Sequence, residues 1–227
     1  MNAPKPFSET SPADRSDGLP LGEVVFRALR EALRDGVYKP GDRLREEEVA
    51  TRLQVSRTPV REAFSRLVSK GLVAPAQGRG LIVRRLETSE VVELYVMREI
   101  LEAAAARLAA RHASDAEIEA LRDLETRFEA VQGEPQDMAR LNRQIHDAMF
   151  AASRNRYLES ALHELQDAIA LLGRTTFSVD GRPDPAAREH RELIEAMAAH
   201  DGDRAEALAR AHIREALRAR LRIMQGG

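Results

Sequence analysis

Residues 40–85 constrain the fold of this chain most, because two short helical patterns are joined by a tight turn and followed by a basic hairpin. The first helix is predicted over residues 46–53. The second begins near residue 57, carries Pro59 where a missing N–H does no harm, and ends at Gly71. Two short strands, residues 72–74 and 81–83, flank a glycine-rich tip. A helix that offers Arg57 and Arg61 from its first turns suits an anionic, grooved surface, and DNA is the clearest candidate.

The rest of the chain also has helical patterns. A helix is predicted at residues 21–34, and others follow at 89–111, 115–131, 136–152, 157–174, 185–200 and 203–224. Aromatic residues make up only 4% of the chain and there is no Trp, so the core must consist mainly of Leu, Ala, Val and Ile. We therefore expect a mostly α protein. Its N-terminal winged helix-turn-helix, with three helices and a β-hairpin wing, is expected to join an antiparallel all-helical bundle.

The composition excludes several kinds of protein. The chain has no Cys, which excludes disulfides and thiolate metal sites and fits a reducing cytoplasm. No apolar run approaches the roughly 18 residues that a membrane span requires, so no membrane partner is expected. Residues 1–18 are polar and rich in Pro, Ser and Asp, and we interpret them as a disordered leader.

Charge divides the chain into two parts. Residues 19–86 carry 14 Lys/Arg against 8 Asp/Glu, a net charge of +6, whereas residues 87–227 carry 19 against 26, a net charge of −7. The alternative is that two helical surfaces differ in charge by chance. A basic unit joined to an acidic one favours phosphate contact by the first alone. We expect a DNA-binding domain at 19–86 and a separate, all-helical domain at 87–227.

The motif in the basic unit resembles a known family. The string VSRTPVREA at residues 55–63, followed by Leu67, Gly71-Leu72 and GRG at residues 78–80, is similar to the winged helix-turn-helix of the GntR family of bacterial transcription regulators. The resemblance implies that Arg57, Thr58 and Arg61 contact DNA. It also implies that the position of Arg45 and the wing tip approach the DNA backbone or minor groove.

The residue types fit these roles. Arg57 and Arg61 lie four residues apart on one helix face, and each arginine that forks onto guanine O6 and N7 contributes about 1–3 kcal/mol of base discrimination. Hydroxyl groups and helix N-terminal amides can bind phosphate. Three glutamates at residues 46–48 begin a helix, where they are expected to favour its dipole. The expected DNA-binding residues are Arg45, Ser56, Arg57, Thr58, Arg61, Arg79 and Gly80.

The acidic unit resembles the FCD effector domain found in the FadR-type branch of that family. The strings that carry the resemblance are MREILE (97–102), LNRQIH (141–146), SRNRYL (153–158), EHRELI (189–194) and RAHI (210–213). Many members of the branch bind a divalent metal through three histidines and a carboxylate four residues before the first. The resemblance places these ligands at Asn142, His146, His190 and His212.

Helical periodicity independently turns the three histidines toward apolar neighbours, where an unpaired ring is costly. A lone inward histidine is more often hydrogen-bonded in a core, so a structural role remains the alternative. Asn142 brings no charge, which predicts weaker metal retention or a site completed by an anionic effector. Imidazole suits zinc, nickel, manganese or iron, and zinc is the metal expected in a crystal.

Arg98 is the candidate for gripping an effector carboxylate, because the family uses this position for ligand contact. We place Glu102, one turn later, in the same effector site. A salt bridge between Arg98 and Glu102 or another acid is the competing interpretation. A metal and an arginine in one cavity would suit a small organic acid.

We therefore expect a bacterial, cytoplasmic and nucleoid-associated transcription regulator. It is expected to be a repressor and a homodimer that reads a palindromic operator, and not an enzyme. One rival is a metal sensor in which the dication is itself the signal. A metallohydrolase is a second rival, although no carboxylate is spaced as a general base. An architectural DNA binder with a purely structural bundle is the third.

Overall fold

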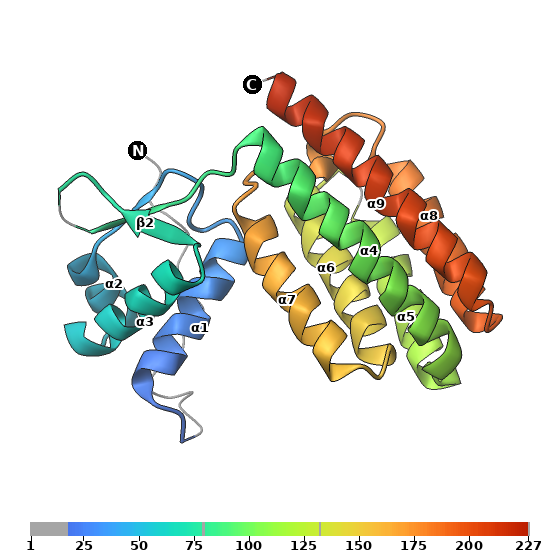
Figure 1. Cartoon of the computed structure of the whole chain (residues 1–227), viewed down its shortest axis with the longest axis horizontal. Helices are drawn as coiled ribbons and strands as arrows, with labels where there is room; N and C mark the ends of the chain where they lie inside the picture. The colour runs from blue at the N-terminus through green and yellow to red at the C-terminus, as the bar shows by residue number, and fades with distance from the viewer. Residues whose placement is uncertain (1–17, 79, 132, 227) are drawn as a thin grey trace. The chain divides into compact units, whose positions relative to one another are not determined.

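The computed structural model describes residues 18–78, 80–131 and 133–226. The predicted leader lies outside these residues except for Gly18, and so does Arg79. The chain forms two compact units (Figure 1). Of the described residues, the first unit contains those up to 86 together with 167–173, and the second contains 87–166 and those from 174 to 226.

The first unit combines three helices with a small sheet. The helices are α1 (Leu21–Arg34), α2 (Glu46–Leu53) and α3 (Arg57–Ser69), and α1 packs against α3. The strands are β1 (Arg43–Leu44), β2 (Val73–Pro75) and β3 (Leu81–Val83), which form an antiparallel sheet in the order β1-β3-β2. The prediction of a two-stranded hairpin missed β1, because a strand of two residues is too short to show alternation.

A leucine and valine core holds the helices of the first unit in place. Leu29 of α1, Leu53 of α2 and Leu67 of α3 are at most 2% exposed and belong to one apolar cluster. Between α2 and α3, Gln54 adopts a left-handed conformation with φ 55° and ends α2. The turn is therefore tight, and α3 starts three residues later with Arg57 and Thr58 in solvent.

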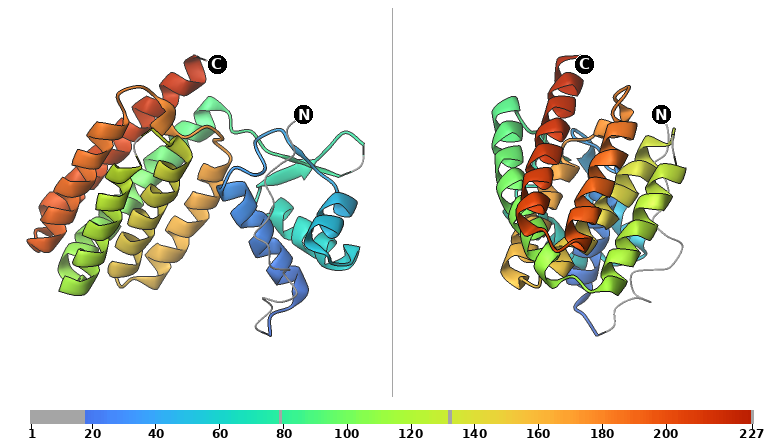
Figure 2. Two further views of the ribbon diagram at one scale, coloured as in Figure 1. Left: turned by 180° about the vertical axis from the view of Figure 1, so that it is seen from behind. Right: turned by 90° about the vertical axis from the view of Figure 1, so that its right-hand side faces the viewer.

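Long helices form the second unit. They are α4 (Thr88–His112), α5 (Asp115–Ala130), α6 (Pro135–Ala152), α7 (Arg156–Ala170), α8 (Pro183–Ala198) and α9 (Gly202–Gln225), with a short 3₁₀ helix, η2 (Thr176–Ser178). Only the last residues of α7, from Asp167 onward, belong to the first unit. Helix α4 lies along α9 and also contacts α6 and α8, while α5 packs on α6 and α8 (Figure 2). The mostly α architecture predicted from the sequence is confirmed.

Small side chains line the inside of α4. Ala103, Ala106 and Ala110 are fully buried there, and Ala205 and Ala209 are buried on α9. Alanine allows two helix backbones to approach closely, and this explains why a core with few aromatic residues suffices. The main correction to the predicted helices concerns α7, which ends at Ala170 instead of residue 174. The chain tightens into two i→i−3 hydrogen bonds after Ala170 and then turns at Gly173, whose φ is +68°.

Candidate DNA interface and metal centre

Helix α3 turns its predicted DNA contacts outward. Its buried face contains Val60, Phe64 and Leu67, while Arg57 and Arg61 on the other side are exposed. Ser56 occupies the N-cap position without a side-chain capping bond, so its hydroxyl group is not used by α3.

Thr58 is exposed in the first turn of α3. Val68 of the same helix is 40% exposed. It lies two turns after Arg61 and therefore shares the solvent side of the helix.

The outward arginines have carboxylate partners on α2. Arg61 Nη2 lies 3.0 Å from Glu46 Oε2, and Arg57 Nη2 lies 2.5 Å from Glu47 Oε1. The hydrogen bond from Arg61 lowers the pKa of Glu46, so this acid remains ionised. The glutamates expected to serve the helix dipole therefore also neutralise the side chains that face outward.

The wing tip lies close to the start of α2. Gly80 has φ +99°, and a Cβ atom there would come within 2.6 Å of the carbonyl oxygen of Leu44. Only glycine fits this approach without strain. Arg45, the residue after Leu44, is exposed and pairs with Glu48 at 3.0 Å. The structure therefore brings Arg45 and Gly80 to one edge of the first unit.

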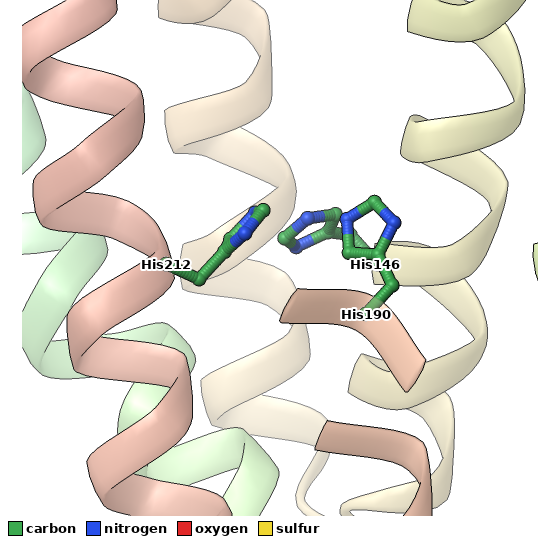
Figure 3. A group of neighbouring side chains, drawn as sticks. All are labelled: His146, His190 and His212. Carbon is green, nitrogen blue, oxygen red and sulfur yellow. The ribbon is translucent and has the colours of Figure 1, made fainter. Parts of the chain in front are cut away.

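In the second unit, three histidines from three helices meet (Figure 3). His146 lies on α6, His190 on α8 and His212 on α9, and each is at most 5% exposed. Their ring centroids are 4.9–5.9 Å apart, and each ring offers a nitrogen that lies within 4.8 Å of the others. Nitrogens at these separations can ligate one metal ion, because zinc–nitrogen bonds are about 2.0–2.1 Å long.

Carboxylates orient two of these rings from behind. Nδ1 of His212 lies 2.6 Å from Oε2 of Glu189, which Arg182 binds through two nitrogens at 2.7 and 2.9 Å. Nδ1 of His146 lies 2.7 Å from Oε2 of Glu102, and neither atom makes a hydrogen bond among the described residues. A carboxylate on one ring nitrogen directs the other nitrogen toward a metal, which is the usual support for a histidine ligand.

Burial and charge fix the ionisation of the cluster. Burial lowers the pKa of His190 and of His212 well below the ordinary value, and the neighbouring rings lower both further. Burial would raise the pKa of Glu102, but Arg98 and His146 outweigh it and hold that pKa at about 2. At neutral pH, His190 and His212 are thus neutral and able to donate lone pairs, while Glu102 is an anion.

The cluster fits a metal ion because several of its buried nitrogen and oxygen atoms have no hydrogen-bond partner among the described residues. Both ring nitrogens of His190 are buried without a hydrogen-bond partner among the described residues, and so is Oδ1 of Asn142. Leaving a buried polar atom unpaired costs about 1–3 kcal/mol, so such atoms commonly mark a ligand or a water site. Asn142 lies one turn before His146 on α6, where its oxygen is a candidate fourth ligand.

Comparison with known proteins finds a family model that matches each of the two units. The model of bacterial regulatory proteins of the gntR family matches residues 21–83, and the FCD domain model matches residues 93–215. The chain belongs to the GntR family. It is therefore a transcriptional regulator with an effector-binding FCD domain, rather than an enzyme.

Named relatives of this GntR-family regulator lie in several bacteria. It is 31% identical over 191 residues to the Nta operon transcriptional regulator of Aminobacter aminovorans, covering 83% of this chain and 89% of the relative. It is 33% identical over 173 residues to a probable D-xylose utilization operon transcriptional repressor of Paenarthrobacter nicotinovorans, covering 73% and 74%. The solved structure of McbR/YncC from E. coli superposes with a TM-score of 0.83 at 21% identity over 91% of this chain and 99% of that one, which shows the shared fold.

The structure of this GntR-family regulator brings the two predicted effector residues beside the three histidines that the sequence singled out. Arg98 and Glu102 are buried on α4 and pair at 2.7 Å, as the competing interpretation held, and Glu102 also touches His146. The predicted effector residues and the three histidines therefore form one cluster.

Sequence reasoning missed Glu189 and Arg182. Glu189 adjoins His190 in sequence but contacts His212, so only the packing of α8 on α9 reveals its role.

The described helices were also compared with the length and apolarity that a membrane span requires, and none of them meets both.

Proposed function

We propose that this GntR-family regulator is a repressor whose affinity for DNA is controlled by a small organic acid, bound beside a divalent metal in the FCD domain. The observation that carries the proposal is the convergence of three buried histidines, of which His190 has no hydrogen-bond partner for either ring nitrogen among the described residues. A core that serves packing alone would pair or replace such atoms. The repressor role is supported by the name of the relative from Paenarthrobacter nicotinovorans.

We assign DNA binding to residues 19–86, and effector binding and dimerisation to residues 87–227. Arg57 and Arg61 read bases in a palindromic operator, because their exposed guanidinium groups sit on the first turns of α3. Phosphates and the minor groove are contacted by Arg45, Ser56, Thr58, Arg79 and Gly80. The regulator acts on the nucleoid in the cytoplasm.

We assign Asn142, His146, His190 and His212 as the metal ligands, with zinc, nickel, manganese or iron as the ion. When bound, the metal supplies a Lewis-acidic anchor for a carboxylate. Glu102 and Glu189 hold His146 and His212 from behind, which supports this assignment.

The effector binds at the Arg98–Glu102 pair, which is supported by the contact between Glu102 and His146. An incoming carboxylate competes with Glu102 for the Arg98 guanidinium. Helix α4 carries both residues and begins at Thr88, five residues after the end of β3, so a shift in its packing reaches the wing through a short link. An effector that favours the DNA-free arrangement weakens DNA binding by the factor by which DNA weakens effector binding.

A second function is a metal sensor in which the dication itself is the signal. The closed Arg98–Glu102 pair favours it, because Arg98 is already neutralised without an organic acid.

Melting temperatures of the purified regulator separate these functions. Small carboxylic acids are screened with and without a chelator, beside zinc alone. A ligand at about 100 times its Kd stabilises by roughly 2.7 kcal/mol, which is about 5–11 °C for a chain of this size. We expect one class of acid to raise the melting temperature and the chelator to abolish the rise. If metals alone raise it and acids do nothing, the organic-acid proposal is wrong and the metal sensor is favoured.

Homodimerisation is proposed through an apolar stripe on α4. Val92, Val96 and Ile100 recur every fourth residue, and with Met97 they are 38–49% exposed. A stripe of this kind on a helix marks a protein contact. A second copy is the occupant we propose, because two recognition helices are needed for a palindrome.

Changing Val96 and Ile100 together to glutamate is expected to convert the dimer to monomers, because like charges would face each other across the two-fold axis. Light scattering after gel filtration gives the mass directly. Tyr157→Glu is the matched control, since Tyr157 is 83% exposed but lies on α7. A double variant that keeps the dimer mass would exclude α4 as the interface.

A further inference from the structure

Three consecutive glutamates at the start of α2 each hold one arginine of the proposed DNA interface. Arg61 Nη2 lies 3.0 Å from Glu46, Arg57 Nη2 lies 2.5 Å from Glu47, and Arg45 Nη1 lies 3.0 Å from Glu48. Among the described residues, each of these ion pairs joins a different glutamate to a different arginine. Two of the pairs join α2 to α3 across 10 and 15 residues of sequence.

We propose that Glu46 and Glu47 are specificity-determining residues, which compete with DNA for Arg57 and Arg61 and so suppress binding to non-specific sequences. The inference rests on the proposed assignment of these two arginines to the operator. In the free regulator, the carboxylates occupy the guanidinium groups. On DNA, each arginine exchanges its carboxylate for a phosphate or a base edge.

The geometry indicates that Glu46 competes with a base for Arg61 and does not merely hold Arg61 in position for DNA. Glu46 receives both Nε and Nη2 of Arg61, at 3.3 and 3.0 Å, through one carboxylate. Guanine would use such a two-nitrogen edge of arginine through O6 and N7. Arg61 thus cannot present this edge to Glu46 and to a guanine at the same time.

Exposure makes the exchange reversible. The side chains of Arg57 and Arg61 are 60% and 70% exposed, and that of Glu47 is 70% exposed. Exposed ion pairs are weak because water screens them. A correct base can therefore displace the carboxylate, whereas a loosely placed phosphate gains little by doing so.

The helix dipole does not account for the arrangement. All three acids lie in the first turn of α2, where a negative charge is favourable. The dipole explains acids at this end of α2, but it gives no reason for each to meet a separate arginine. A repulsive element aimed at wrong partners is a usual source of specificity, because the glutamates also repel phosphates when no base contact compensates.

The test compares the regulator with its Glu46→Gln, Glu47→Gln double variant on two duplexes. One is a random-sequence duplex, and the other is the duplex that the unaltered regulator enriches from a random library. Fluorescence anisotropy is expected to show random-sequence affinity rising between about twofold and thirtyfold, from the usual strength of two exposed pairs. The ratio of specific to non-specific affinity falls.

Salt dependence supplies a second readout. Each freed arginine that gains a phosphate steepens the slope of log K against log salt by about 0.9. The random-sequence slope of the double variant is therefore expected to steepen by up to about 1.8. A variant that only loosens α2 would bind both duplexes more weakly, without a steeper slope.

The matched control is Glu119→Gln with Asp137→Asn, which removes the same charge from two exposed pairs, with Arg122 and Arg140, in the FCD domain. If the double glutamate variant binds random DNA no better than this control, the inference is overturned. Circular dichroism checks folding, and Glu47→Gln alone serves if the double variant unfolds. If Arg57→Ala with Arg61→Ala leaves binding to both duplexes unchanged, the assigned DNA interface fails instead.

Discussion

Replacing Arg57 and Arg61 together by alanine is expected to lower affinity for the operator by about 2–6 kcal/mol, since each forked contact to guanine contributes about 1–3 kcal/mol. This corresponds to a loss of roughly thirtyfold to more than ten-thousandfold. Both side chains are exposed and make no contribution to the core, so the fold should persist. Anisotropy titrations with the selected duplex measure the loss.

Specificity should fall together with affinity. Base readout is lost in the double variant, whereas phosphate contacts by other groups remain, so its preference for the operator over random DNA should shrink. Arg122→Ala is the control, because Arg122 is an exposed, paired arginine on α5. A variant that weakens binding to every sequence equally would show that these arginines contact phosphates only.

The second large effect is expected at the histidine cluster. His190→Ala should abolish the metal-dependent rise in melting temperature, because it removes one of the three clustered rings, whose two nitrogens have no hydrogen-bond partner among the described residues. At a metal concentration of about 100 times Kd, the lost stabilisation is roughly 2.7 kcal/mol. Scanning calorimetry with and without zinc measures it, and elemental analysis gives the metal content.

Two further variants test this result, one as a control outside the cluster and one that is expected to bind the metal more tightly. His163→Ala should keep the full rise, since the side chain of His163 is 41% exposed on α7 and lies away from the cluster. Asn142→Asp should retain metal more tightly, because a carboxylate would add a negative charge where the amide oxygen is now unpartnered. Stoichiometric metal in His190→Ala would show that the ion is held elsewhere.

Local patterns were sufficient to predict most of the fold. The bounds of α1 and α2 agree with the prediction to the residue, because turn residues at Asp35-Gly36 and Gln54 end clear apolar stripes. The end of α7 was predicted wrongly because the apolar periodicity continues through Leu171 and Leu172 while the backbone tightens. Strand β1 was missed because its partner β3 lies almost forty residues away in sequence.

The candidate site could be predicted only in part. Helical spacing turned His146, His190 and His212 inward, and the structure brings them together. The partners of the rings could not be predicted, because Glu102 and Glu189 reach them from other helices. Helix periodicity tells which face a residue occupies, but not which residue lies opposite it.

The three-stranded sheet joins the wing rigidly to the segment that precedes α2. Backbone bonds from Gly41 to Val83 and from Val83 to Asp42, both 2.9 Å long, tie the segment before α2 to the returning strand of the wing. One residue inserted into β3 would slip this register and turn Val83, now 1% exposed, toward solvent. We therefore expect changes in chain length to be tolerated between Ala76 and Gly80 and not within β3. The length of the wing tip can then change without disturbing the sheet that holds the wing beside the start of α2.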